Sequence, residues 1–314
     1  MRACVHVLRA VACARESTET APSDTDCVRS VTILNDGDQA KQEAKAPFSE
    51  YGSVCDAVVY GDPSDPANFP AGDFDIVIDN NGKDLGACQP LIDHYKGSAK
   101  QYFFVSSAGM YIPDDVEPER VETDAVKASA GHNAVETYLR DSGIDYTIFR
   151  PQYIYGQYTT KPAYLGYYID RIVRDKPVPI PAPGVQLTSL TNVEDVASMI
   201  VCAVGCDGAK KETFNIATDR YVSLDGVAKL VASSLGKEAD IKHYDHANAG
   251  LKKGEGFPMR TVHFICSVEK AKAKLGWQPK HALEEDLAAV IADYKAAGND
   301  TKDIDFSVDE KIFA

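Results

Sequence analysis

Three features of the sequence predict a doubly wound α/β fold, a parallel Rossmann-like sheet with a smaller C-terminal lobe. Short apolar runs alternate with helical patterns from residue 31 to residue 204. The runs show no polar alternation, which indicates strands that are covered on both faces by helices. The chain has 314 residues, which is enough for one large core and a second lobe.

The expected elements alternate along the chain. Strands are predicted at 30–34, 55–62, 74–81, 101–107 and 145–151, and helices at 84–97 and 124–142. Right-handed crossovers between such strands place helices on both faces of one sheet. We expect an atypical segment over 1–30, a Rossmann-like core over 31–204 with 152–182 contributing to the small lobe, and a small lobe with an acidic tail over 205–314.

The first thirty residues differ in composition from the rest. They contain Arg2, Arg9 and Arg15 with no acid before Glu16, and Cys4, Val7, Leu8 and Val11 would share one face of a helix. Three interpretations stay open: a remnant of a targeting peptide, a replacement for the first strand and helix, or a wrong gene start. The first strand and its glycine loop are therefore predicted to be atypical or missing.

Charge is distributed unevenly along the chain. The net charge of −14 argues against a uniformly basic nucleic-acid-binding surface. Residues 241–281 nevertheless hold eight Lys and Arg against three acids, whereas 283–314 hold nine acids against three lysines. This asymmetry allows a local basic patch on an acidic protein.

Cysteine usage and hydropathy restrict the class of protein further. The eight cysteines are scattered and form no C-x-x-C pair, which favours a reducing compartment and argues against a metal site. No apolar run approaches the roughly 20 residues that span a bilayer, so we predict no membrane partner.

Polar residues follow the predicted strands. Asp36, Asp62 and the pair Asn80 and Asn81 each come directly after an apolar run. The carboxyl ends of parallel strands meet at one edge of a sheet, where such folds bind their ligands. These residues are candidates for a vestigial cofactor site, although each also suits a turn or a helix cap.

Several motifs carry a resemblance to known families. SSAGMY (106–111) and RPQYIYG (150–156) resemble segments of extended short-chain dehydrogenases, as does the V-x-D-V-A sequence at 193–197. The segments IVIDNNGKDL, FFVSSAGMY, DAVKASAGHNAVETYL, FRPQYIYG and DRIVRDKPVPIP are similar to the chloroplast stem-loop binding protein family. That resemblance spans about 31–312.

The resemblance implies a function in plastids. It implies binding of plastid RNA stem-loops, association with ribosomes or the transcription machinery, and metal-dependent endoribonuclease activity, for which Mg²⁺ is a candidate cofactor. It also implies a location in the chloroplast stroma. An assembly with a second copy or a paralogue stays open.

Dehydrogenase chemistry is predicted to be lost. Hydride transfer in the resembling dehydrogenases uses a Tyr hydroxyl and a Lys four residues later. The corresponding positions here are Ala128 and His132, and Ser107 alone would only orient a carbonyl. The first glycine is Gly37, so no glycine-rich turn precedes it to hold a pyrophosphate. We predict no tightly bound cofactor and doubt NAD(P) binding; no metal ligands are assigned.

Basic residues of the C-terminal half are the candidates for contacting RNA. Lysine and arginine side chains hold the backbone of RNA, and aromatic rings stack on its bases. The predicted contacts are Arg171, Arg174, Lys252, Lys253, Arg260, Lys270 and Lys274. A helix over 267–275 would turn its lysines outward and Ala271 and Leu275 inward, and Trp277 also suits a core position.

The sequence therefore predicts a plastid RNA-binding protein of the atypical short-chain dehydrogenase type, ribosome- or transcript-associated, with endoribonuclease activity undecided. One alternative is an NAD(P)-dependent nucleotide-sugar epimerase or reductase with altered catalytic residues. A second is a non-catalytic assembly scaffold.

Overall fold

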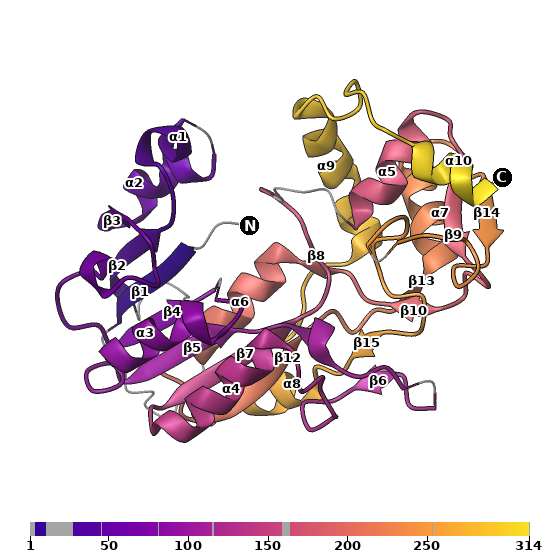
Figure 1. Ribbon diagram of the computed structural model, residues 1–314. Helices are drawn as coiled ribbons and strands as arrows, with labels where there is room; N and C mark the ends of the chain where they lie inside the picture. Colours follow the sequence, from indigo (N-terminus) through magenta and orange to yellow (C-terminus); the bar gives the residue numbers. More distant parts are fainter. Residues whose placement is uncertain are drawn as a thin grey trace.

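A seven-stranded sheet forms the body of the protein (Figure 1). The computed structural model describes residues 4–10, 28–44, 46–80, 82–114, 116–158, 164–252 and 254–313. The strands of the sheet, in spatial order, are β12 (Glu212–Ile216), β7 (Tyr146–Pro151), β5 (Gln101–Val105), β4 (Ile76–Asp79), β1 (Cys4–Ala10), β2 (Val28–Asn35) and β3 (Ala57–Tyr60). All neighbouring pairs are parallel except those that involve β1. The predicted doubly wound sheet is confirmed.

Strand β1 occupies the slot between β2 and β4 but runs antiparallel to both. Its first residue, Cys4, pairs with Asn35, and Val5 pairs with Asp79, which are the last residues of β2 and β4. The helical face expected for this segment is therefore wrong. A short apolar run does not distinguish helix from strand by periodicity alone, and two neighbouring strands here supply its backbone with hydrogen-bond partners.

The two faces of the sheet are covered by helices. In β5, Tyr102 and Phe104 pack with α3 (Leu85–Tyr95) and α4 (Gly131–Ser142), whereas Phe103 points to the opposite face. Helices α6 (Val193–Ala203) and α8 (Glu269–Leu275) contribute to the core on that opposite face. Alternate residues of one strand thus serve two cores, because successive side chains point to opposite sides of a sheet.

Helix α4 begins later than the sequence predicts. Residues 124–127 instead pair with 110–112, since the amide of Ile112 donates to the carbonyl oxygen of Ala125 and that of Lys127 donates to Met110. Residues 128–129 form a turn before the helix. The helix predicted at 124–142 is therefore wrong for its first seven residues. The sequence pattern of this segment gave no sign of the long-range pairing.

The small lobe has its own core. The core is built from α5 (Leu165–Val173), α7 (Leu224–Ser234), α9 (Leu283–Ala296) and the parallel pair β9 (Val178–Pro181) and β14 (Ile241–Tyr244), with α10 (Ser307–Phe313) near the end of the chain. The predicted boundary at residue 204 does not follow this packing. Strand β12 lies in the main sheet and α8 packs on its face, and the acidic tail supplies Leu287 and Ile291 to the lobe.

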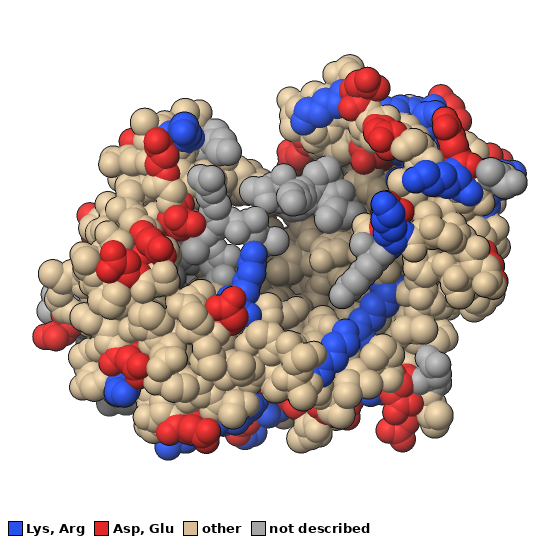
Figure 2. Space-filling model, viewed as in Figure 1, with Lys and Arg blue, Asp and Glu red and all other residues tan. Residues whose placement is uncertain are grey.

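Short elements complete the chain. Paired strands are β6 (Glu119–Arg120) with β15 (Ile265–Cys266), β8 (Ile154–Tyr155) with β11 (Thr191–Asn192), and β10 (Leu187–Thr188) with β13 (Val222–Ser223). The short helices are α1 (Gln39–Glu43), α2 (Tyr51–Val54), η1 (Phe48–Glu50), η2 (Pro66–Asn68), η3 (Ala108–Met110) and η4 (Asp207–Ala209). Among the described helices none combines the length and the apolar character needed to cross a membrane. Figure 2 shows a hollow between the body and the small lobe.

Candidate functional site

A buried carboxylate lies under the floor of the cleft. Glu136 is 0% exposed, and its Oε1 accepts hydrogen bonds from Ser106 Oγ at 2.7 Å and Arg150 Nε at 3.0 Å. Its Oε2 accepts from Arg150 Nη2 at 2.6 Å and from Arg140 Nη2 at 2.7 Å. Burial alone would raise the pKa of Glu136, but Arg150 together with Ser106 and Arg140 holds that pKa below its usual range.

The same network continues across the sheet. Arg150 Nη1 donates to Tyr111 Oη at 2.8 Å and to the carbonyl oxygen of Glu122 at 3.0 Å. Tyr111 Oη in turn donates to Asn215 Oδ1 at 2.7 Å. These bonds fasten α4, the carboxyl ends of β5 and β7, and β12 to one another. The Ser106 hydroxyl therefore serves the fold, and it is not directed at a substrate.

The degenerate dehydrogenase positions lie at the cleft without dehydrogenase chemistry. Ser107 caps η3, where its Oγ accepts from the amide of Gly109 at 3.1 Å. Ala128 is exposed and has no proton to transfer. His132 is half-buried beside Phe104, with 6.1 Å between ring centroids, and burial lowers its pKa. Its imidazole is therefore neutral at pH 7 and carries no positive charge to replace a lysine.

The described candidate cofactor residues follow three strands of the main sheet. Asp62 closes an exposed turn, because its Oδ1 accepts from both the amide and the hydroxyl of Ser64. Asp36 and Asn80 follow β2 and β4 at the cleft edge of the sheet. Asn81 lies outside the described residues.

The body does not fit a dinucleotide. Pyrophosphate binding in such folds needs a glycine turn that leaves the carboxyl end of the first strand. Here the amino end of β1, at Cys4, meets the cleft edge beside Asn35, so the carboxyl end lies at the opposite edge of the sheet. The carboxyl end of β1, from which the usual phosphate cradle would leave, therefore does not lie at the cleft edge.

Two cations instead converge on one carbonyl group at the cleft. Arg260 Nη2 donates to the carbonyl oxygens of Gly109 and Tyr111, both at 2.8 Å. Lys127 Nζ also donates to Gly109, at 3.5 Å. The guanidinium carbon of Arg260 lies 3.9 Å from the Phe264 ring centroid. Burial lowers the pKa of Arg260, and no described carboxylate lies within ion-pair distance of it. This partly desolvated cation is suited to an anionic ligand.

A third cation lies near the start of α4. A Cβ atom at Gly131 would come within 2.3 Å of the Lys83 carbonyl oxygen, so glycine allows α4 to approach this loop closely. Lys83 is exposed and contributes to the lowered pKa of His132. Figure 2 shows Lys and Arg side chains on both sides of the hollow. Sequence reasoning missed Lys83 and Lys127, because no motif marked them and the start of α4 was misplaced.

Two predicted RNA contacts are structural. Arg171 is 8% exposed, donates to both carboxylate oxygens of Asp309 at 2.8 and 2.6 Å and stacks on Tyr167. Arg174 Nη2 donates to the carbonyl oxygens of Asn299 and Lys302. Both side chains fasten the C-terminal segment to α5, so their prediction as surface contacts for RNA is wrong.

The lysines of α8 are neutralised by acids. Lys270 and Lys274 both form ion pairs with Glu212, and Lys272 pairs with Asp219 and Glu269. The inward positions of Ala271 and Leu275 are confirmed. Trp277 is buried and donates to Ser198 Oγ at 2.9 Å, as expected for a core residue. These ion pairs argue against α8 as the RNA surface.

The remaining predicted contacts are Lys252, Lys253 and Arg260. Lys252 is exposed beside Glu255, whose carboxylate accepts from the Lys252 amide. Lys253 lies outside the described residues. Among the described residues of the predicted set, Arg260 reaches the cleft floor, and it is therefore the anchor of the candidate site.

A polar junction joins the two lobes beside the cleft. His281 Nδ1 lies 3.1 Å from Asp286 Oδ2, and its Nε2 lies 3.4 Å from Glu194. Other groups of the junction are Asp195, which accepts from the amide of His281, and Tyr155 and Asn192, which donate to Asp286. Burial alone would lower the pKa of His281, but Asp286 and the other acids raise it above its usual value.

The His281 junction predicts a pH dependence of stability. The pKa of His281 is raised in the folded state. Its contribution to the free energy of unfolding is therefore complete below the pKa of histidine in the unfolded chain, about 6.5, and is lost as pH rises through the folded-state pKa. We expect His281→Gln to lower the melting temperature more at pH 6 than at pH 8.5. Melting curves across this range measure the effect. The pH dependence should disappear in an Asp286→Asn background, and its persistence there would assign it to another group.

Comparisons with known proteins agree with this architecture. The model of the NAD dependent epimerase/dehydratase family matches residues 85–217. The 41 kDa chloroplast stem-loop binding protein b of Arabidopsis thaliana is 34% identical over 252 residues, which is 79% of this chain and 66% of that protein. A UDP-glucuronic acid 4-epimerase from Bacillus cereus aligns with a TM-score of 0.63 at 16% identity, over 80% of this chain and 85% of that one. A UDP-glucose 4-epimerase from Thermotoga maritima aligns with a TM-score of 0.56 at 22% identity, over 83% of this chain and 82% of that one.

The sheet, the small lobe and these matches define an α/β protein of the NAD-dependent epimerase/dehydratase type. Within that type, the chain belongs to the chloroplast stem-loop binding protein family. It spans 66% of the length of the Arabidopsis relative.

Proposed function

We propose that this protein binds stem-loop RNA in its cleft, in the chloroplast stroma. The observation that carries the proposal is the convergence of Arg260 and Lys127 on the carbonyl oxygen of Gly109. A guanidinium with no carboxylate partner among the described residues is ready to take a phosphate oxygen. The Arabidopsis relative is named as a chloroplast stem-loop binding protein, which supports both the ligand and the compartment.

Aromatic rings accompany this cation. Tyr153 Oη accepts from the amide of Arg260 at 2.9 Å, and the Tyr153 ring lies 4.7 Å from Tyr164 and 5.6 Å from Phe264 between centroids. Tyr164 is half-buried, so part of its ring is accessible. Unpaired bases in an RNA loop stack on such rings, while the phosphates contact the cations.

Equilibrium binding of a labelled stem-loop RNA tests this proposal. We expect the affinity to fall steeply with salt, because phosphate contacts release counterions. A stem-loop should bind more tightly than a duplex of the same stem, because the loop exposes bases for stacking. Absence of binding at low salt would overturn the proposal.

Pyridine nucleotide binding is expected to be absent. The reversed β1 offers no cradle at the cleft edge, and Ala128 and His132 replace the groups that transfer hydrogen. Calorimetric titration with NADPH should show no saturable heat up to about millimolar ligand. Micromolar affinity would instead favour the epimerase or reductase alternative, and an active epimerase titrated in parallel is the positive control.

Cleavage and assembly are further parts of the proposal. Among the described residues no three His, Cys, Asp or Glu side chains gather to hold a metal ion, so no residue is assigned to Mg²⁺-dependent ribonuclease activity. Incubation of the same RNA with and without chelator measures cleavage directly.

We also propose association with ribosomes or the transcription machinery, and pairing with a second copy or a paralogue. Co-sedimentation tests both. An assembly that forms without RNA binding would favour the scaffold alternative.

A further inference from the structure

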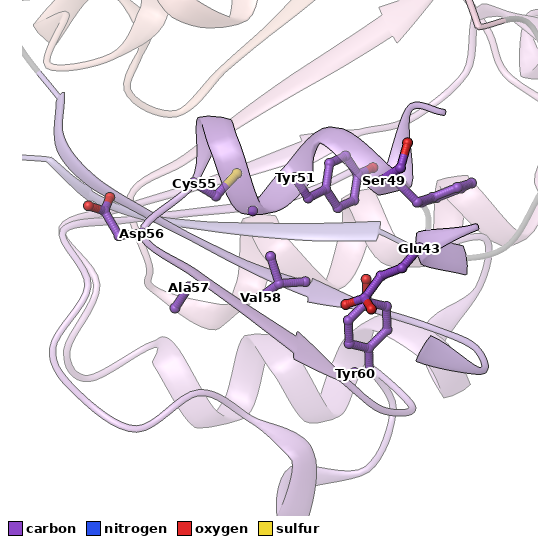
Figure 3. Close-up of a pocket in the computed structure, with 10 residues that line it drawn as sticks. Glu43, Ser49, Tyr51, Cys55, Asp56, Ala57, Val58 and Tyr60 are labelled. Atoms are coloured by element: carbon purple, nitrogen blue, oxygen red, sulfur yellow. The ribbon is translucent and has the colours of Figure 1, made fainter. Parts of the chain in front are cut away.

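A pocket of about 380 Å³ lies at the β3 edge of the sheet (Figure 3). It is formed between the edge strand β3 and the short helices α1, η1 and α2. Its lining residues are Glu43, Phe48, Ser49, Tyr51, Gly52, Cys55, Asp56, Ala57, Val58 and Tyr60. No sequence motif marked this pocket, because its walls come from short, irregular segments.

The pocket combines aromatic rings with carboxylates. Phe48 and Tyr51 meet edge to face, with ring centroids 5.6 Å apart and an interplanar angle of 73°. Tyr60 provides a third ring, and Figure 3 shows the Glu43 side chain beside it. Among the described residues, the lining contains neither Lys nor Arg. Aromatic faces and carboxylates attract organic cations and repel phosphates, so the pocket is not a second RNA site.

The carboxylates retain capacity for a ligand. Glu43 is exposed and accepts from Gln39 at Oε1. Asp56 accepts from the amide of Val31 at Oδ2. In each side chain the structure shows no hydrogen bond from a described residue to the other oxygen. A planar guanidinium can donate to a carboxylate and stack on a ring at the same time, whereas an ammonium cannot stack in this way.

An open strand edge runs along the pocket. Within the described sheet β3 pairs with β2 alone, so its outer backbone groups are available to another strand. An extended peptide that adds to such an edge places alternate side chains into adjoining pockets. Ala57, Val58 and Tyr60 belong to both the strand and the pocket lining, which puts the pocket within reach of an added strand.

We propose that this pocket binds an arginine side chain of an extended, basic segment of a partner protein, with that segment pairing along β3. The charge of the pocket carries the choice of partner, because its described lining residues include carboxylates and rings but no basic side chain, and the whole chain has a net charge of −14. The inference is independent of RNA binding, because the pocket and the cleft use different residues and attract opposite charges.

A capped hexapeptide of alternating arginine and valine is the probe, titrated into the full-length chain by calorimetry. We expect saturable one-to-one binding. The same peptide with citrulline in place of arginine keeps the shape and loses the charge, and it should bind at least about tenfold more weakly. Glu43→Gln and Tyr60→Ala should each weaken binding of the arginine peptide about five- to tenfold.

The control separates a built pocket from general attraction to an acidic protein. Glu117→Gln removes one exposed carboxylate outside the pocket and should leave peptide binding unchanged. Equal binding of the citrulline peptide, or an equal loss in Glu117→Gln and Glu43→Gln, would overturn the proposal. Glu43 is exposed, so its variant should fold even if Tyr60→Ala does not. Stem-loop RNA binding should remain unchanged in Glu43→Gln, which keeps the two proposals distinguishable.

Discussion

Changing Arg260 to glutamine is expected to weaken stem-loop RNA binding about tenfold and to reduce the salt slope of the binding constant by about one. The guanidinium donates to the carbonyl oxygens of Gly109 and Tyr111 through Nη2, and its Nη1 is buried without a hydrogen-bond partner among the described residues, so its positive charge is not neutralised by a described carboxylate and attracts a phosphate. Glutamine removes this positive charge. Filter binding across a range of salt concentrations measures both quantities.

Two further variants make this result specific. Lys127→Gln removes an exposed cation at the same carbonyl and should also reduce the salt slope. Lys274→Gln is the matched control, because Lys274 is ion-paired with Glu212 outside the cleft. An equal effect of Lys274→Gln and Arg260→Gln would contradict the cleft as the site. Since Arg260 also supports the cleft floor, melting curves should accompany each measurement, and Arg260→Lys should keep the salt slope.

The strands of the sheet could be predicted because the sequence pattern of each strand is visible within a few consecutive residues. The runs at 101–107 and 145–151 have apolar and aromatic centres without polar alternation, as expected for a strand covered on both faces, and they become β5 and β7. The reversed β1 was not predictable, because its direction depends on pairing with β2 and β4 rather than on its own residues. The helix predicted over 124–130 was wrong for the same reason, because this segment pairs with residues 110–112, which lie outside the local pattern.

The candidate site was less predictable than the fold. A count of basic residues does not show which are already paired. Arg171 and Lys270 raised the local positive charge in the sequence, but Asp309 and Glu212 neutralise them from positions distant in the chain. Arg260 differs because none of the described acids reaches it. The distinction lies in tertiary packing, which is why sequence reasoning could name Arg260 without ranking it above the others.

Replacing Glu136 with leucine is expected to destabilise the fold by about 3–5 kcal/mol, the cost of leaving a buried charge unpaired. The Arg150 side chain is only 4% exposed and would lose both carboxylate contacts. A loss of this size should lower the melting temperature by about 6–15 °C. The pKa of Glu136 is lowered in the folded state. The contribution of its carboxylate to the free energy of unfolding is therefore present above the pKa of the unfolded chain and is lost as pH falls through the folded-state pKa. Thermal unfolding at pH 7 and at acidic pH measures both effects.

The partner variants show whether the buried pair or the carboxylate alone is responsible. Arg140→Ala removes the partly exposed partner and should cost no more than about 1 kcal/mol. Glu136→Leu with Arg150→Met replaces the buried pair by apolar groups and should recover much of the stability, because no buried charge is left unpaired. If Glu136→Leu cost no more than Arg140→Ala, the carboxylate would not hold the cleft floor together. If Glu136→Leu costs the larger amount, it should also lower the affinity for RNA. The reason is that Arg150 positions Tyr111, whose carbonyl oxygen accepts from Arg260.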